Sequence, residues 1–419
     1  MSEVENNWKP AAMSRIESET KAPNGFKWLI FSNKLGFKPK MLEPIDPNDW
    51  KTIISNLQSW GEIPEGEIVV EEVLDSDRGI YLKLNNNGIF WLAEFFPWGT
   101  DGRFRARISL APTGSDVAIG GYTWNGIDII SVRKWNNVIR DIDSKLHEAI
   151  SSNDLEKSKQ IIHKSSAAIG RYHKAAEGAR VTPNDSKRWN QRLANLEALL
   201  RAHTIWRAPH TKDTVCIINL GDIRFSDMIN DNSGEYKIHF SRPRLADSIL
   251  KPECEFPAIR DFSSLLHDLN RIYHSCDSKI KISDLRVALI EGWRSTAPPI
   301  WCSKKVFYTP RGGAFFWEYE QCLLDVIEST SHQSGKPEPA VSIIHDVKYL
   351  QKSMFSHRTI GALSFMTGFF SISGFYLNLV GSSDDLISPL ILLPITIGVF
   401  LAYRRLAPSP ETPILRKWN

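Results

Sequence analysis

The chain has 419 residues, which is enough for two or three domains of ordinary size. Hydrophobic residues make up 42% and charged residues 24%, which excludes a disordered or fibrous chain. The 51 Lys and Arg against 48 Asp and Glu give a net charge of +3, so the basic excess typical of a dedicated nucleic-acid-binding protein is missing. The 5 cysteines contain no Cys-x-x-Cys pair, which argues against a disulfide framework or a zinc ribbon and fits a reducing compartment.

Residues 1–64 are expected to form an N-terminal extension. Its first part, Met1–Asn24, is polar and contains no apolar run typical of a signal peptide. The segment Pro47–Trp60 reads as a helix. From residue 65 to residue 130 the pattern changes to short apolar runs, at 68–70, 80–82 and 89–92, separated by turn-forming residues. This pattern predicts a small β-rich lobe built as an antiparallel meander.

Residues 131–329 are expected to form a helical lobe, because the apolar period changes to 3.6 residues after Val132. One predicted helix carries Trp135, Val138, Ile139, Ile142 and Leu146 on one face. A second helix begins near Asn153, and Thr182-Pro183 supplies the cap and first turn of a third. The helical segment is rich in Lys and Arg, so its outer face is either simply solvated or turned toward anionic lipid headgroups. A linker is expected over 330–357.

Two uncharged apolar runs follow, Thr359–Gly381 and Leu386–Tyr403, each close to the roughly 20 residues that cross a hydrocarbon core. They predict a transmembrane helical hairpin over 358–406 and a cytoplasmic tail over 407–419. A buried hairpin of a soluble core is the alternative. Basic residues lie on both flanks, whereas the connecting loop has two acids and no base. Basic flanks stay in the cytoplasm, so we expect a multi-pass protein of the inner (cytoplasmic) membrane with both termini cytoplasmic.

Small residues form a stripe in the first apolar run, with Gly361, Ser364, Gly368 and Ser371 at i, i+3, i+7 and i+10. Such a stripe lets two helix backbones approach closely. It serves either the packing of the hairpin itself or a homo-oligomer that forms through the hairpin.

Four segments resemble protein kinases. Trp91–Gly99 is similar to the third strand of bacterial protein kinases, whose pattern is Ala-Ile-Lys-Glu-Phe/Tyr-Phe/Leu-Pro. Asn219–Ile229 looks like the catalytic loop of the kinase-like superfamily, His-Gly-Asp-x-x-x-x-Asn-Ile, and Gly234–Ser241 resembles the strand and turn that carry Asp-Phe-Gly. Arg260–Leu266 resembles the start of the large buried helix. The resemblance to the bacterial serine/threonine protein kinase-like superfamily covers about residues 65–330 and implies an α+β, two-lobed protein-kinase-like fold ahead of the hairpin.

Phosphoryl transfer needs a lysine for the phosphates, an acid that orients the attacking hydroxyl, and acids or amides that hold Mg²⁺. By the resemblance, the lysine position is occupied by Ala93 and the metal-binding Asp position by His239, a poor ligand for Mg²⁺. The hairpin expected over the nucleotide, Val73–Lys83, has one glycine where the family has several. Asp222 remains in the place of the catalytic Asp, and Asp227 in that of the metal-binding Asn.

These departures identify the chain as a degenerate member, a pseudokinase. We expect a membrane-anchored scaffold or regulatory binding module with little or no phosphotransfer, no cofactor and no metal. Its expected partners are a protein at the cytoplasmic membrane face and membrane lipid, and no nucleic acid. One alternative is an atypical kinase at the membrane that uses ATP and Mg²⁺, with Lys83 in place of the missing lysine. A second alternative is a structural subunit of a membrane protein complex, in which the hairpin is the functional part.

The residues singled out also have purely structural interpretations. Asp222 then braces its loop by hydrogen bonds, and Asp227 is the acid of a turn. Asp261 is expected as a helix N-cap, because a carboxylate there accepts bonds from backbone amides. His239 reads as a core histidine and Glu94 as a surface charge.

Overall fold

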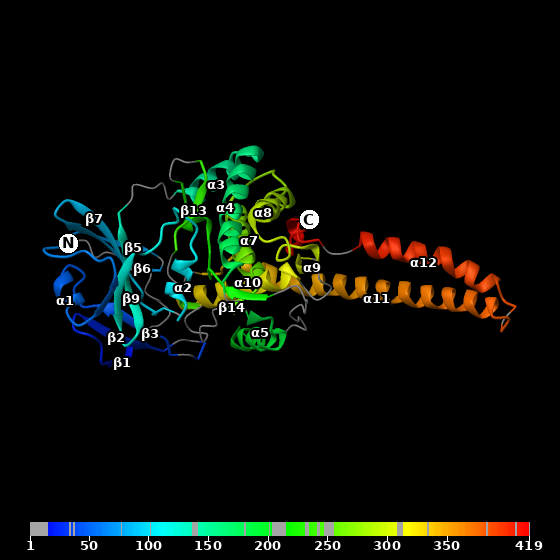
Figure 1. Cartoon of the computed structure of the whole chain (residues 1–419), viewed down its shortest axis with the longest axis horizontal. Coiled ribbons are helices and arrows are strands. Elements are labelled where there is room, and N and C mark those ends of the chain that lie inside the picture. Colours follow the sequence, from blue (N-terminus) through cyan, green and yellow to red (C-terminus); the bar gives the residue numbers. More distant parts are fainter. Residues whose placement is uncertain are drawn as a thin grey trace.

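The structure is a computed structural model. It describes residues 16–418, apart from 33–34, 37, 77, 101, 136–140, 180–181, 201, 203–214, 231–233, 241–243, 247–254, 308–312, 333–334, 383 and 407–408. Figure 1 shows a β-rich lobe, then a helical lobe, and then a helical hairpin that projects away from both. This is the mixed α/β order of elements that the sequence predicts.

The described part of the chain begins with a three-stranded antiparallel sheet of β1 (Ile16–Thr20), β2 (Phe26–Phe31) and β3 (Lys40–Pro44). The predicted helix over 47–60 is shorter than expected, because α1 (Trp50–Ile54) is followed by β4 (Gln58–Gly61). Strand β4 pairs with Gly120 and Gly121. A Cβ on Gly120 would lie 2.0 Å from the carbonyl oxygen of Glu62, so the missing side chain lets the backbones approach and the segment join a sheet.

The second sheet has six strands in the order β4-β8-β9-β7-β6-β5, with every neighbouring pair antiparallel. The three strand runs predicted from the sequence are confirmed. The sheet is completed by β5 (Val69–Ser76), β6 (Gly79–Asn86), β7 (Ile89–Phe95), β8 (Gly120–Trp124) and β9 (Ile127–Lys134), with α2 (Phe104–Ser109) between β7 and β8.

The two faces of this sheet differ in character. Leu82, Ala93 and Val132 lie side by side in register on one face, and all three are buried in an apolar cluster with residues of β2, β3 and α1. Because side chains alternate along a strand, Glu94 and Arg133 project from the other face, where they contact the helical lobe. The N-terminal extension is therefore a second apolar layer that covers the back of the lobe.

The helical lobe packs around one large apolar core. Helices α4 and α8 approach closely, because a Cβ on Gly292 would lie 2.4 Å from the carbonyl oxygen of His163. The lobe consists of α3 (Ile142–Ser151), α4 (Leu155–Ala176), α5 (Ser186–Leu200), α7 (Ile259–Ser275), α8 (Ile282–Thr296), α9 (Lys304–Phe307) and α10 (Ala314–His332), with short strands β10 (Thr182–Pro183), β11 (Val215–Ile218), β12 (Met228–Asn230), β13 (Tyr236–Ile238) and β14 (Glu255–Phe256).

Two helix starts differ from the prediction. Val132 belongs to β9, which pairs with β7 in the middle of the sheet, and the first helix of the lobe begins only at Ile142. Val138 and Ile139 lie outside the described residues. Thr182 and Pro183 pair with β11 as a short strand, and the helix after them begins at Ser186. In both places pairing with a distant strand overrides the local helical pattern.

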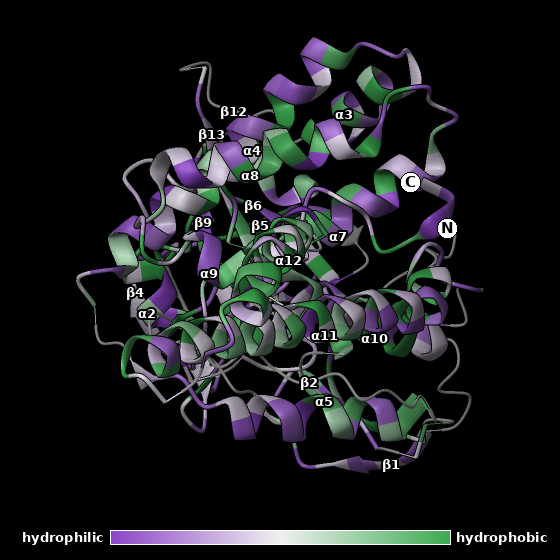
Figure 2. Cartoon of the chain, turned by 90° about the vertical axis from the view of Figure 1, so that its right-hand side faces the viewer, coloured by the Kyte–Doolittle hydropathy of each residue, from purple (hydrophilic) through white to green (hydrophobic). Residues whose placement is uncertain are grey.

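The hairpin consists of α11 (Ala340–Leu379) and α12 (Ile387–Arg405), both long and apolar enough to cross a membrane by length and composition. Its outer apolar side chains are exposed, for example Phe365 at 74% and Ile372 at 71%. Figure 2 shows hydrophobic residues on several sides of α12. The expected linker over 330–357 is mostly helical, because α10 ends at His332 and α11 begins at Ala340.

The stripe of small residues on α11 faces α12. A Cβ on Gly361 would lie 2.8 Å from the ring of Tyr403, and one on Gly368 would lie 3.2 Å from Thr396. Ser371 is buried and donates a hydrogen bond of 3.0 Å to the carbonyl oxygen of Pro389. The stripe therefore serves the packing of the hairpin, and a homo-oligomer through the hairpin would need other faces of these helices.

The C-terminal tail returns to the helical lobe after the hairpin. Ile414 and Leu415 are buried in its core, and Arg286 donates a hydrogen bond of 2.9 Å to the carbonyl oxygen of Pro410. The backbone N–H of Arg416 donates to Asp346 at 2.9 Å. Trp418 packs edge-on against Tyr273. The hairpin is thus attached to the same lobe at both of its ends (Figure 1).

Candidate functional site: an aspartate held by three arginines

The site lies in the loop that follows β11. The backbone N–H groups of Leu220 and Gly221 donate to the carboxylate of Asp261, at 2.9 and 3.3 Å. The sequence predicted Asp261 as a helix N-cap, but the N-cap residue of α7 is Ala258 and Asp261 lies in the first turn. Its carboxylate satisfies amides of the loop instead of amides of its own helix.

Helix α7 fixes the rest of the loop in the same way. The N–H of Ile223 donates to Ser264 Oγ at 3.2 Å, and the N–H of Phe225 donates to Asp268 at 2.8 Å. Asp261, Ser264 and Asp268 are spaced i, i+3 and i+7, so they lie on one face of the helix. This face holds the loop in one conformation and positions the side chain of Asp222.

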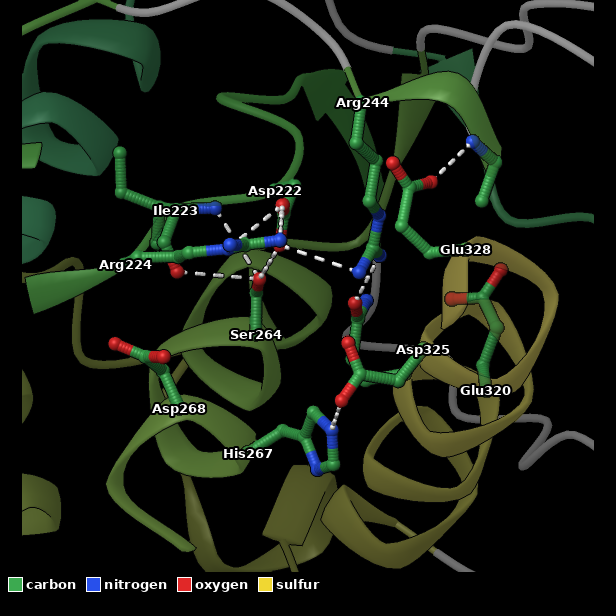
Figure 3. A network of polar contacts seen from close by, with 12 residues as sticks. Asp222, Ile223, Arg224, Arg244, Ser264, His267, Asp268, Glu320, Asp325 and Glu328 are labelled. Carbon is green, nitrogen blue, oxygen red and sulfur yellow. Dashed lines mark hydrogen bonds and ion pairs between the residues drawn. The ribbon is translucent and has the colours of Figure 1, made fainter. Parts of the chain in front are cut away.

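Three guanidinium groups surround the Asp222 carboxylate (Figure 3 shows two of them). Its Oδ2 lies 3.1 Å from Nη2 of Arg78 and 3.1 Å from Nη2 of Arg224, and its Oδ1 lies 3.4 Å from Nη1 of Arg244. Ser264 Oγ also donates to Oδ1 at 3.2 Å. Burial would raise the pKa of Asp222, but the charges of Arg224, Arg244 and Arg78 hold this pKa well below its ordinary value. Asp222 is therefore an ionised and very weak base.

Arg78 reaches this carboxylate from the other lobe. It lies in the turn between β5 and β6, the hairpin expected to cover a nucleotide, and its side chain is only 6% exposed. The same guanidinium lies 3.6 Å from Asp227 Oδ2. A cationic side chain from the hairpin thus occupies the space between the two acids, in the part of the site where the resemblance implies phosphate and metal.

Asp227 is a turn acid with an additional ion pair. It ends a short 3₁₀ turn, and its Oδ2 accepts a hydrogen bond of 2.9 Å from the N–H of Arg224. Burial raises the pKa of Asp227, although the charge of Arg78 acts in the opposite direction. Among the described residues there is no group of three or more His, Cys, Asp or Glu that could hold a metal ion.

A second buried network joins the lobes beside the first. Arg133 Nη2 donates to Glu94 at 2.8 Å and to the carbonyl oxygen of Phe240 at 3.2 Å, while its Nη1 donates to the carbonyl oxygen of Asp116 at 2.8 Å. His239 Nδ1 lies 2.7 Å from Asp116 Oδ2. Burial and the charge of Arg133 lower the pKa of His239. Glu94 is fully buried, so the interpretation as a surface charge is wrong.

The strand register shows that the side chain of Ala93 does not face the helical lobe. The resemblance places Ala93 at the lysine position, but its side chain lies in the apolar layer behind the sheet. The side chain of Glu94 is the one that faces the helical lobe at this point, and it is already bonded to Arg133. Neither residue supplies a cation for phosphate.

Lys83 lies on the lobe-facing side of the sheet, opposite Leu92. Its Nζ is 5.0 Å from the ring centroid of Phe90 and 5.2 Å from that of Trp135, which places it over two aromatic rings. Lys83 lies five positions after Arg78, which corresponds to about 17 Å along an extended strand. The structure therefore does not bring Lys83 together with Asp222 and Asp227.

The residues that dominate the site, Arg78, Arg224, Arg244 and Arg133, were not singled out from the sequence. Arg224 had a signal, because it follows Asp222 by two residues inside the predicted catalytic loop. Arg78 had a weaker signal, because it is a cation in a turn where the family pattern has glycines. Arg133 and Arg244 come from segments without any motif, and only the fold brings them to the site.

No protein-family model matches the sequence, and no curated protein matches it. Solved structures do match. A glucosamine kinase in complex with glucosamine, ADP and inorganic phosphate aligns with 78% of this chain and 94% of its own, at 10% identity and a TM-score of 0.47. A protein from Ralstonia eutropha assigned as an aminoglycoside phosphotransferase aligns with 70% of this chain and 92% of its own, at 12% identity and a TM-score of 0.39. Similarity at this level carries no information on the activity or the substrate of this chain.

We predict that Asp222→Asn lowers the free energy of unfolding by about 3–5 kcal/mol, because it leaves three buried guanidinium groups without their shared carboxylate. The exposed Glu67→Gln is the matched control and is expected to stay within about 0.5 kcal/mol of the wild type. Chemical unfolding of the full chain in detergent measures both variants.

The difference between wild type and Asp222→Asn should also depend on pH. Because the pKa of Asp222 is depressed in the folded chain, its stabilisation is present above the unfolded pKa of about 4 and is lost as the pH falls further. A difference in stability that stays constant down to pH 2, or one that is close to zero at pH 7, would contradict the arginine cluster that Arg78, Arg224 and Arg244 form around Asp222.

Proposed function

We propose that this chain is a membrane-anchored pseudokinase, which acts as a scaffold or regulatory binding module at the cytoplasmic face and does not transfer phosphate. The observation that carries the proposal is the state of Asp222. A catalytic acid in this place must accept a proton from a hydroxyl group, and this requires a free oxygen within hydrogen-bond distance of the substrate. Here both oxygens are engaged by Arg78, Arg224 and Arg244.

Within the described part of the chain, the other requirements of phosphoryl transfer also lack suitable side chains. Asp227 stands in the place of a residue that would bind Mg²⁺, but its carboxylate contacts Arg78. The acid next to Arg133, Glu94, is consumed in a buried ion pair between the lobes. Losing a single preorganised charge often costs about 10²–10³ in rate, and several are replaced here.

Membrane anchoring is supported by the hairpin. Phe365, Phe369 and Ile372 on α11 are exposed in the structure. An exposed apolar surface of this extent is unfavourable in water, which supports contact with a membrane. The docked C-terminal tail and α10 attach both ends of the hairpin to one lobe, which requires both ends to lie on the same side of a membrane. Lys352 and Arg358 at one end and Arg404 and Arg405 at the other favour the cytoplasmic side and contact with anionic lipid.

An atypical kinase is the second candidate, and one observation favours it: Lys83 lies on the side of the sheet that faces the helical lobe. A nucleotide held there would need Arg78 to leave the two acids. The aromatic stacking of Lys83 and its distance along the strand from Arg78 make this candidate the weaker one.

We predict that the full chain in lipid nanodiscs shows no ATP turnover above a protein-free background with Mg²⁺ or Mn²⁺, because Asp222 has no oxygen free to act as a base. Phosphate release from ATP measures this directly. Lys83→Ala changes a half-buried residue outside the arginine cluster, and its phosphate release should equal the same protein-free background. Turnover that disappears in Lys83→Ala would establish the atypical kinase and overturn the proposal.

We predict that the hairpin loop is reached from outside the cell and the tail is not. In intact bacterial cells that express the full chain, a membrane-impermeant maleimide should label Ser382→Cys but not Ser409→Cys. The native cysteines all precede residue 323, and the wild type gives their background. Equal labelling of both positions, or labelling of Ser409→Cys alone, would contradict this topology.

A further inference from the structure

A pocket of about 320 Å³ lies beside the arginine cluster. Only one of its lining residues, Arg78, comes from the β-rich lobe. The others come from the loop after β11, from the segment after β13, from α7 and α10, and from the segment ahead of α11. The pocket is lined by Arg78, Arg224, Arg244, Arg271, Asp325, Glu328, Ser329, His332, Lys336, Pro337 and Glu338.

Five of these side chains are cationic. Arg224 and Arg244 extend toward Asp222 from different directions (Figure 3), and with Arg78 they form one wall. Arg271 on α7 adds a fourth guanidinium, whose contacts with Asp268 and Asp325 are long, at 3.5 and 3.7 Å. Lys336 is exposed at the rim. Guanidinium groups present several N–H donors in a fork that matches phosphate oxygens.

The three carboxylates of the lining are each held by a donor of the protein. Asp325 Oδ2 lies 3.1 Å from His267 Nε2, and hydrogen bonding and the charge of that histidine help hold the pKa of Asp325 low against burial. Glu328 accepts from the N–H of Ala246 at 2.7 Å and contacts His332 at 3.1 Å. Glu338 accepts from the N–H of Ser342 at 3.3 Å. These partners hold the three carboxylates in place, and the lining carries five cations against three acids.

We propose that this pocket binds a soluble small molecule that carries a phosphoryl group. The phosphoryl oxygens would lie against Arg271, Lys336 and the guanidinium wall, and the volume leaves room for a small organic part whose hydroxyl groups reach the carboxylates. The inference goes beyond the proposed function, because that proposal names no small-molecule ligand.

A free molecule fits the position of the pocket better than a lipid headgroup. Lys336 precedes the first apolar run by more than 20 residues, most of them in one continuous helix. At 1.5 Å per residue, the pocket lies about 30 Å from the membrane end of that helix segment. The ligand would instead contact the residues directly ahead of α11, so its binding is connected to the helix that enters the membrane.

The test uses the full chain in nanodiscs of zwitterionic lipid, titrated calorimetrically with inorganic pyrophosphate without Mg²⁺ or nucleotide, at constant ionic strength. Saturable binding of one pyrophosphate per chain is expected. Arg271→Ala and Lys336→Ala should each weaken the affinity about tenfold, because each removes one charge-assisted contact. Lys187→Ala, which removes an exposed cation on α5, is the matched control and should leave the affinity unchanged.

Absence of saturable binding, or equal affinity of the wild type and both pocket variants, would overturn the proposal. Stabilisation of the chain only by nanodiscs that contain phosphatidylinositol phosphate, without binding of pyrophosphate, would also overturn it and would assign the site to lipid. The result does not depend on ATP turnover, so a failure here is distinguishable from a failure of the pseudokinase proposal.

Discussion

The shared ion pair between Asp222 and the guanidinium groups of Arg78, Arg224 and Arg244 is the interaction on which the arrangement of the lobes depends. It joins the turn of a β-hairpin, the loop after β11 and the segment after β13 at one buried carboxylate. A buried cation without a partner costs several kcal/mol, so these three segments hold one another in place. The same contacts fill the space in which the kinase resemblance implies phosphate and metal, so the stability of this arrangement and the proposed lack of phosphotransfer have one physical cause.

The hairpin is part of the same body and not a loose tether. Helix α11 runs without interruption from the edge of the pocket into the apolar region, and the tail after α12 docks on the helical lobe through Leu415 and Trp418. The small residues of α11 pack against α12, and the larger apolar side chains of the hairpin remain exposed. Lys336 and Glu338 at the pocket rim therefore lie directly ahead of a helix that continues into the apolar hairpin.

The fold could be predicted further than the site. Alternating strands at 80–82 and 89–92 and the two apolar runs have strong local signals, and these elements are present. Val132 was misread because its partner in the sheet, Ala93, lies 39 residues away and is invisible to a local pattern. At the site, the motif located Asp222 but not what surrounds it. Charge pairing across the lobes depends on tertiary structure, and arginines in irregular segments resemble ordinary surface residues in the sequence.

A double-mutant cycle between Arg78 and Asp222 tests the central claim most directly. The free energies of unfolding of Arg78→Ala, Asp222→Asn and the double variant give the coupling between two residues that are 144 positions apart in the sequence. Close contact between the lobes predicts a coupling of about 1–3 kcal/mol, since removal of either partner already breaks the pair. Additive effects, within about 0.5 kcal/mol, would show that the hairpin turn does not hold this aspartate and would contradict the account.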